Sequence, residues 1–419
     1  MKKTATLLAT LAVALSTGVS TQAAELRMSW WGGDSRHIAT QEALKICGDK
    51  YGHTISPEFT GFNGHLEKLT TQLAGGTEAD IMQVNWPWLP LFSKNGDGLA
   101  DLGALSDIID LSNWTEEQLA SGSMKGVLNG LPVSTTGRVF MFNEGSYEAA
   151  GVAVPTTWGE LLAATPAFKE KLGDEAYPFD ATTLDVVLLV SMVTTQATGK
   201  DLVDPATNTV AWTAEELAKG IAFYQNLVDT GTIRSWEGAA ASGTDNLWEM
   251  PEWADGHLAG SYQWDSTYSK YADPITVGHL VPVGILTIDG AVTEGVYRKP
   301  SMTFAISKRS KDPQAAAQVL NCLLNEPEGI AAMSDQRGLP SSKAALAELE
   351  KLGKIDPTLK AANDIVMAGS GPTVSPYNED PQVRDTFQST LEEFAYGQLS
   401  AMEAAEIIID GINGRLAEL

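Results

Sequence analysis

The sequence predicts an α/β fold built as two lobes. Its 419 residues exceed the length at which a single hydrophobic core usually stops growing, which favours two lobes or domains. Short apolar stretches alternate with amphipathic ones over residues 26–84, a pattern typical of a mainly parallel sheet covered by helices on both faces. A second such region begins near residue 137, and the C-terminal part of the chain is expected to be helical.

The first 24 residues are predicted to be a signal peptide. Lys2 and Lys3 precede a short apolar run over residues 7–19, and small residues then lead to a predicted cleavage site near Ala23 or Ala24. The run is too short and too weakly apolar to favour a membrane anchor. Because no cysteine directly follows it, lipid attachment is not expected, and the pattern predicts export to the periplasm.

The first α/β region contains three predicted strands and two predicted helices. The strand over residues 26–31 ends at Gly32-Gly33, which indicates a turn. The helix over residues 66–73 is closed by Gly75-Gly76, which is typical of a helix C-terminus. The remaining elements are a helix over residues 37–51 and strands over residues 54–59 and 79–84.

The second region starts with a predicted strand over residues 137–143. A helix is expected to begin near Thr157, which is a suitable N-cap residue and is followed by Glu160 in the first turn. Further helices are expected over residues 214–228, 313–324 and 402–416.

The charge of the chain excludes several kinds of partner. There are 53 acidic and 28 basic residues, and the net charge is −25. An acidic surface of this kind repels nucleic acids and anionic lipid headgroups, so neither is expected to be a partner.

No catalytic or metal-binding motif stands out. The chain lacks the His-Glu-x-x-His, Gly-x-Ser-x-Gly and phosphate-loop patterns, and its acidic residues are scattered as on a solvated surface. The five histidines show no metal-ligand spacing, and the two cysteines are too far apart for a thiolate zinc cluster. We therefore expect no catalytic residue, no metal and no cofactor. A secreted glycan-active enzyme remains the rival class of function.

Tryptophans at predicted strand ends are the main functional signal. Trp30-Trp31 ends the first strand, residues 85–88 (Asn-Trp-Pro-Trp) follow the third, and residues 263–265 (Gln-Trp-Asp) lie in the second region. Loops at the carboxyl ends of strands form the ligand crevice of an open α/β sheet. Indole rings stack on the apolar faces of sugars, and neighbouring amides and carboxylates bind sugar hydroxyls, so the pattern predicts a carbohydrate site. Four other tryptophans are expected to be structural: Trp114, Trp158, Trp212 and Trp253.

The mature chain also resembles extracellular solute-binding proteins of carbohydrate ABC transporters, the maltodextrin-binding superfamily. The resemblance rests on the order and spacing of five segments, residues 29–33, 73–81, 155–161, 304–307 and 337–340. Within that family, three segments look most like periplasmic binding proteins for oligogalacturonides, which are pectin-derived: residues 27–33, 61–66 and 82–89.

This resemblance implies a two-lobed periplasmic-binding-protein fold of the type II-like class, with a hinge of two or three crossing strands. Lobe one would comprise residues 25–136 and 300–342, and lobe two residues 137–299 and 343–419. The implied protein is a periplasmic monomer that closes over an oligosaccharide and delivers it to the membrane permease subunits of an ABC transporter. A receptor for a neutral oligosaccharide or a polyol is the alternative within the same class.

The sequence itself leaves the pairing of the two cysteines open. In an oxidising compartment Cys47 and Cys322 could form a disulfide, and otherwise they would be two separate buried thiols. The resemblance places both cysteines in lobe one, which favours the disulfide.

An acidic sugar would need local cations in this acidic chain. Four basic residues beside predicted ligand loops are suitable, and ion pairing with nearby acids is the alternative role for each: Arg36, His37, Arg138 and Arg337. The complete set of candidate ligand-binding residues is Trp30, Trp31, Gly33, Arg36, His37, Asn63, Asn85, Trp86, Trp88, Arg138, Gln263, Trp264, Asp265 and Arg337.

Overall fold

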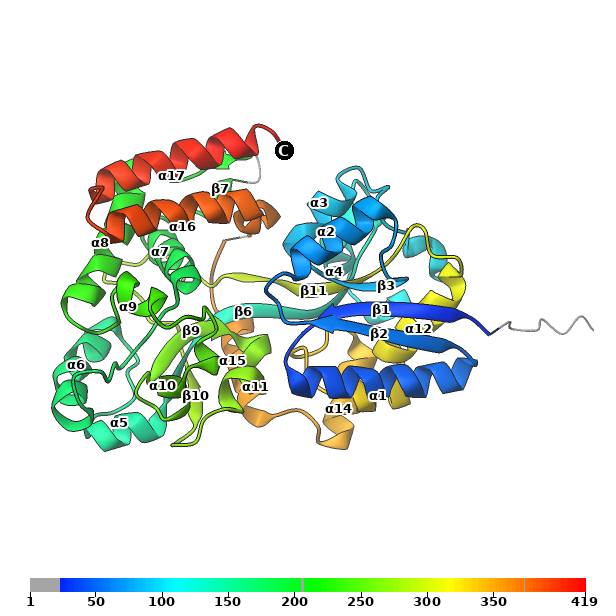
Figure 1. The fold of residues 1–419 in the computed structure, drawn as a ribbon, viewed down its shortest axis with the longest axis horizontal. Helices are drawn as coiled ribbons and strands as arrows, with labels where there is room; N and C mark the ends of the chain where they lie inside the picture. Colours follow the sequence, from blue (N-terminus) through cyan, green and yellow to red (C-terminus); the bar gives the residue numbers. More distant parts are fainter. Residues whose placement is uncertain (1–22, 205–206, 373) are drawn as a thin grey trace, which may run out of the picture.

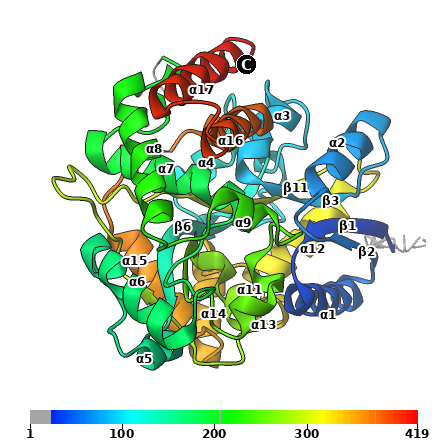
Figure 2. The same ribbon diagram turned by 60° about the vertical axis from the view of Figure 1, so that its left-hand side comes forward.

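The computed structural model describes residues 23–204, 207–372 and 374–419. Apart from Ala23 and Ala24, the predicted signal peptide lies outside the described residues. The chain forms two α/β lobes that lie side by side along the long axis of the molecule (Figure 1). The C-terminal helices α16 (Pro381–Ala395) and α17 (Ala401–Leu416) pack on each other at the edge of lobe two, as both ribbon views show (Figures 1 and 2).

One sheet of seven strands runs through both lobes. Its order is β10-β6-β11-β3-β1-β2, and β9 pairs with β6. β1 is parallel to β2 and β3, as predicted for residues 26–84, whereas β11 is antiparallel to β3 and β6. The strands are β1 (Glu25–Trp31), β2 (Thr54–Thr60), β3 (Ile81–Asn85), β6 (Leu131–Asn143), β9 (Gly260–Trp264), β10 (Leu280–Val283) and β11 (Arg298–Ile306). Two small hairpins join β4 (Ser123–Met124) to β5 (Val127–Leu128) and β7 (Val203–Asp204) to β8 (Thr209–Val210).

Lobe one follows the predicted alternation of strands and helices. α1 (Asp34–Tyr51) lies on one face of β1 and β2, and α2 (His65–Gly75) lies on the other (Figure 1). α1 begins earlier than the predicted residue 37, because Gly33 is already the extended N-cap. The hydrophobic core of lobe one contains Met28, Leu44, Ile81, Phe304 and Leu320. The other elements are η1 (Trp86–Trp88), α3 (Leu89–Ser93), η2 (Gly103–Leu105), η3 (Leu111–Asn113), α4 (Glu116–Ser121), α12 (Pro313–Asn325) and α13 (Pro327–Met333).

Lobe two has a separate hydrophobic core that includes Phe140, Trp158, Phe179 and Tyr262. The predicted helix start is confirmed, because the Thr157 hydroxyl accepts a hydrogen bond from the Glu160 N–H at 3.1 Å. In the described part of the chain, no helix is both long and apolar enough to cross a membrane. The elements of lobe two are α5 (Glu144–Ala150), α6 (Trp158–Leu172), α7 (Thr183–Thr198), α8 (Ala214–Asp229), α9 (Trp236–Ala240), η4 (Leu247–Glu249), α10 (Pro251–Ala254), η5 (Asp265–Thr267), α11 (Tyr268–Ala272), α15 (Pro357–Ala368), η6 (Pro376–Glu379), α16 and α17.

Two long strands connect the lobes. β6 pairs with β11 through residues 131–137 and with β9 and β10 through residues 138–143, so its two halves belong to different lobes. β11 pairs with β6 near Arg298 and continues beside β3 from Met302 to Ile306. Both strands are seen between the lobes in Figure 1. They are two of the covalent links that position the two walls of the site described below.

A third connection follows the helices of lobe one. α14 (Lys343–Leu352) packs against α13 through a small cluster of Ile330, Ala345 and Leu349. The predicted boundary between lobe one and lobe two, after Ser342, therefore falls between α13 and α14, which pack together. We propose that the chain crosses between the lobes after α14, over residues 353–356.

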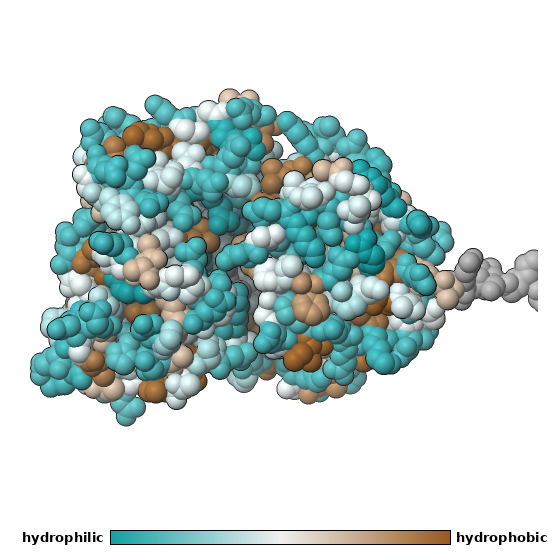
Figure 3. Space-filling view, viewed as in Figure 1, coloured by the Kyte–Doolittle hydropathy of each residue, from teal (hydrophilic) through white to brown (hydrophobic). Residues whose placement is uncertain are grey.

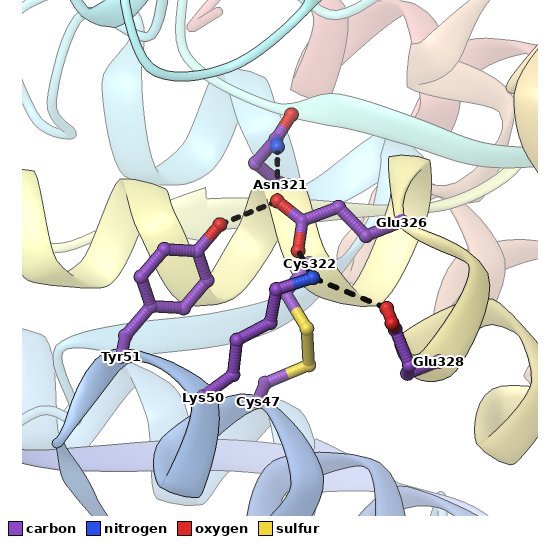
Figure 4. Close-up of a disulfide and its surroundings, with 7 residues drawn as sticks. All are labelled: Cys47, Lys50, Tyr51, Asn321, Cys322, Glu326 and Glu328. Atoms are coloured by element: carbon purple, nitrogen blue, oxygen red, sulfur yellow. Dashed lines mark hydrogen bonds and ion pairs between the residues drawn. A yellow bond between two sulfur atoms is a disulfide. The ribbon is translucent and has the colours of Figure 1, made fainter.

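The two cysteines form a disulfide in lobe one. Cys47 of α1 and Cys322 of α12 are bonded, with 5.8 Å between their Cα atoms (Figure 4). Beside them, Lys50 forms ion pairs with Glu326 at 2.9 Å and Glu328 at 3.1 Å. The disulfide thus joins the first helix of the lobe to a helix that the chain forms only after it has passed through lobe two.

Candidate ligand-binding cleft

A cavity of ≈ 930 Å³ lies between the lobes. Its walls come from the start of α1, the loop before α2 and the end of β3 in lobe one, and from α7, η4, β9 and α11 in lobe two. The space-filling view shows the molecule hollowed between its two halves (Figure 3). Nine of the predicted residues line the cavity: Trp31, Gly33, Arg36, His37, Asn63, Asn85, Arg138, Gln263 and Trp264.

The lobe-one wall carries an aromatic ring and two free amides. Trp31 is 7% exposed, and its ring lies 5.7 Å from that of Phe62, which also lines the cavity. Asn63 and Asn85 face the same space, and within the described residues their side chains have no hydrogen-bond partner. This wall therefore combines a surface for stacking with amide groups that are available to hydroxyls.

The lobe-two wall carries a second indole ring, Trp264, at the end of β9. In the register of β6 and β9, Trp264 lies opposite Arg138, so their side chains share one face of the sheet. The Arg138 guanidinium carbon is 5.3 Å from the Trp264 ring centroid, and Lys299 Nζ is 4.7 Å from it. Tyr297 meets the ring edge-on at 5.6 Å. These contacts hold Trp264 in place while it lines the cavity.

Arg138 and Gln263 line the cavity, but their polar groups are used inside the protein. Arg138 forms an ion pair with Asp185 at 2.6 Å and also donates to the Tyr262 carbonyl. Gln263 donates to the same Asp185 at 2.7 Å and accepts from Tyr271 at 2.8 Å. Of the two roles considered for Arg138, ion pairing with an acid is therefore the one that the structure shows.

The start of α1 presents Arg36 and His37. Arg36 donates to the carbonyls of Gln336 at 2.9 Å and Trp31 at 3.4 Å, and burial lowers its pKa to about 10. His37 accepts from the Trp30 indole N–H at 3.1 Å, and burial lowers the pKa of its imidazole. His37 thus favours the neutral form, and Arg36 is the cation of this pair.

Five predicted ligand residues do not line the cavity in this structure: Trp30, Trp86, Trp88, Asp265 and Arg337. Trp30 points to the opposite face of β1 from Trp31, because successive side chains of a strand alternate. Trp86 turns inward and donates to the Ser121 carbonyl at 2.9 Å. Trp88 packs beneath Trp31, with their ring centroids 5.5 Å apart, and so supports the ring that lines the wall.

The two charged residues in that group are held by internal hydrogen bonds. Asp265 accepts from Thr136, from the Gly137 N–H at 3.1 Å and from Asn363 at 2.6 Å, and burial raises its pKa. Arg337 donates to Gln83 at 2.8 Å and to Thr40 at 3.0 Å, beneath the start of α1. The four tryptophans that were expected to be structural are all buried and away from the cavity: Trp114, Trp158, Trp212 and Trp253.

Several lining residues were not predicted. Trp248 lies beside Asn246 and Glu249 in an irregular segment, so the rule applied to the other loop tryptophans could have found it. Lys270 lies in α11, which comes after Trp264 in the chain. Its Nζ lies 3.2 Å from the Trp248 ring centroid. Lys299 pairs with Glu379 at 2.6 Å, and Arg384 comes from α16. For these three cations, the local sequence carries no signal of a position beside the cavity.

Two α/β lobes joined by crossing strands, with a deep cavity between them lined by aromatic rings from both sides, define a two-lobed solute-binding protein. The chain belongs to the bacterial extracellular solute-binding protein family, whose pattern matches residues 42–361. The resemblance inferred from the sequence is thereby confirmed, together with the two-lobed α/β fold.

Solved structures of solute-binding proteins are similar to this chain over nearly its whole length. A periplasmic oligogalacturonide-binding protein from Yersinia enterocolitica, in complex with saturated digalacturonic acid, is 36% identical, with a TM-score of 0.90 over 94% of this chain and 99% of that one. A periplasmic solute-binding protein from Pectobacterium atrosepticum is also 36% identical, with a TM-score of 0.88 over the same shares.

A curated binding protein from Brucella abortus is 31% identical over 129 residues, which are 30% of this chain and 31% of that protein. The match therefore spans about a third of the length of this curated relative.

Proposed function

We propose that this protein is the periplasmic substrate-binding component of a carbohydrate ABC importer and that it captures an acidic oligosaccharide, best described as a pectin-derived oligogalacturonide. The observation that carries the proposal is the pair of indole rings, Trp31 and Trp264, on opposite walls of one cavity. Sugar rings offer apolar faces to such indoles, and a cavity of ≈ 930 Å³ is large enough for more than a monosaccharide.

The cavity wall carries both acidic and basic side chains, and it is the unpaired cations among them that suit an acidic ligand. Although the net charge of the chain is −25, three cations on the wall form no ion pair with a described carboxylate: Arg36, Lys270 and Arg384. A bidentate guanidinium is well suited to a carboxylate. The similar Yersinia protein was solved with digalacturonic acid, which supports the same ligand class here.

Capture would proceed by closure of the lobes about the crossing strands. The sugar has to bind the closed form better than the open one, because a ligand shifts an equilibrium only by its differential affinity. Stacking on both walls provides this difference, since Trp31 and Trp264 belong to different lobes. The closed surface would then dock on the permease subunits of the importer, with the binding protein acting as a monomer in the periplasm.

The proposal is tested by titrating the mature protein with galacturonate oligomers and with neutral oligosaccharides. Binding is followed by tryptophan fluorescence and by the heat of binding in isothermal calorimetry. We expect binding of the uronates that weakens with added salt, because charges near a surface are screened. A response to neutral sugar alone would favour the alternative receptor. Shortening of the recovered oligomers would favour the glycan-active enzyme, whereas a binding protein returns them intact.

Trp264→Ala is expected to weaken the binding of galacturonate oligomers by about 1–3 kcal/mol, because it removes the aromatic face of the lobe-two wall. Isothermal calorimetry measures the change. Tyr396→Ala is the matched control, since this exposed aromatic residue does not line the cavity and its loss should leave the affinity unchanged. An affinity equal to that of the unmodified protein would place Trp264 outside the sugar site.

A further inference from the structure

Two of the side chains that contact the Trp264 ring also bind one carboxylate, that of Glu379 in η6. Lys299 Nζ lies 4.7 Å from the Trp264 ring centroid and pairs with Glu379 at 2.6 Å. Tyr297 meets the same ring edge-on at 5.6 Å and donates its hydroxyl to Glu379 at 3.2 Å. Glu379 therefore fixes two of the contacts that set the orientation of the lobe-two indole.

The ion pair between Lys299 and Glu379 is buried. The two residues are 5% and 8% exposed, and Lys299 Nζ also lies 2.8 Å from the second Glu379 oxygen. Desolvation offsets much of the attraction within a buried pair, so such a pair is weak evidence of a purely stabilising role. Its place between η6 and the indole indicates a second role, in which it holds the ring in one position.

Lobe two holds the chain on both sides of η6. Asp201, in the segment after α7, accepts a hydrogen bond from the Ser375 N–H at 2.9 Å and another from the Asn378 side chain at 2.8 Å. On the other side of η6, Asp380 pairs with Arg415 of α17 at 3.0 Å. The position of η6 is thus set by lobe two, and Glu379 with it.

The same segment also lies against lobe one. η6 packs against η1, which contains Trp88 and which itself packs against the crossing strand β11. Val374, just before η6, is 8% exposed and belongs to the hydrophobic core of lobe one. A contact beside a crossing strand is displaced least when the lobes rotate about that strand. The segment therefore connects the two lobes next to their hinge.

These contacts form a continuous path between the two stacking rings. In lobe one, Trp88 of η1 packs beneath Trp31, with 5.5 Å between the ring centroids. We propose that residues 374–379 form a strut that fixes the two stacking rings relative to each other, and that Glu379 is the positioning residue for Trp264. The proposal rests on the proposed function and deepens it, because the placement of the two rings determines which sugar chains fit between them.

The test follows the two indoles by fluorine NMR in protein labelled with fluorotryptophan, without a ligand. Trp31→Phe and Trp264→Phe assign the two resonances. Glu379→Gln keeps the shape of the side chain but removes its charge. Asp180→Asn is the matched control, because Asp180 forms another buried ion pair of lobe two, with Arg234 at 2.6 Å, that does not line the cavity. Thermal unfolding measures the stability of each variant, and calorimetry measures its affinity for digalacturonate.

We expect both variants to be less stable, and only Glu379→Gln to shift the resonances of Trp264 and Trp31. Glu379→Gln should also bind digalacturonate about 3- to 10-fold more weakly, as for one misplaced aromatic contact, whereas Asp180→Asn should bind it normally. If Glu379→Gln does not fold, Lys299→Met with Glu379→Gln leaves no buried charge in the pair. The Trp31 resonance is then decisive, because Lys299 itself contacts Trp264.

An unchanged Trp264 resonance in folded Glu379→Gln would overturn the positioning role of Glu379. A shift of Trp264 without a shift of Trp31 would overturn the strut, because the two walls would then be independent. Failure of the unmodified protein to bind digalacturonate, with both resonances shifted as expected in Glu379→Gln, would overturn the proposed function and leave the strut standing.

Discussion

Replacement of Arg138 by methionine is expected to lower the free energy of unfolding by about 3–5 kcal/mol, because it leaves a buried carboxylate without its cation. Arg138 is 1% exposed and lies 2.6 Å from Asp185, which is also buried. Methionine fills part of the same volume but provides no charge or hydrogen bond for Asp185. Urea denaturation measures the change as a lower midpoint at an unchanged slope.

The same ion pair offers an internal control. In Arg138→Met with Asp185→Asn, the buried charge is gone, and we expect part of the lost stability to return, since Gln263 and Thr182 still contact the amide position. Lys360→Met breaks an exposed pair with Asp364 and should have a much smaller effect. If Arg138→Met and Lys360→Met lowered the midpoint equally, the buried pair would not have the structural role assigned to it.

Arg138 also shows where reasoning from the sequence stops. The pairing of β6 with β9 places it beside Trp264. The carboxylate that forms its ion pair, Asp185, lies 47 positions away in the sequence, on α7. Nothing local distinguishes this arginine from Arg36, whose guanidinium has no carboxylate partner among the described residues. Lys270, in contrast, lines the cavity although the sequence gives no sign of it. Only the packing of α11 against η4 brings this helical lysine to the cavity.

The predicted elements agree with the structure where hydrophobic period and capping residues decide them. The strand ending at Trp31, the helix capped by Thr157 and the amphipathic helix at residues 214–228 depend on local chemistry, and each was found close to its predicted bounds. Whether a tryptophan at the end of a strand faces the cavity depends on the local backbone turn, which the sequence pattern does not show. Trp31 and Trp264 face the cavity, while Pro87 places Trp86 in a short 3₁₀ turn that directs its indole toward Ser121.

The removal of the disulfide by Cys47→Ala with Cys322→Ala is expected to lower the free energy of unfolding by about 2–5 kcal/mol. The two cysteines are 275 positions apart, and the loop between them contains most of lobe two. Without the bond, the unfolded chain gains the conformational freedom of this long loop, whereas α1 and α12 still pack in the folded state. Thermal and urea unfolding measure the loss.

Two comparisons separate the cross-link from simple loss of packing. Dithiothreitol should lower the stability of the unmodified protein toward that of the double variant and should leave the double variant unchanged. Affinity for the sugar should be equal in all samples, because neither cysteine lines the cavity. An oxidised protein no more stable than the double variant would show that the packing of α1 against α12 and α13, rather than the disulfide, holds α1 to the later part of lobe one.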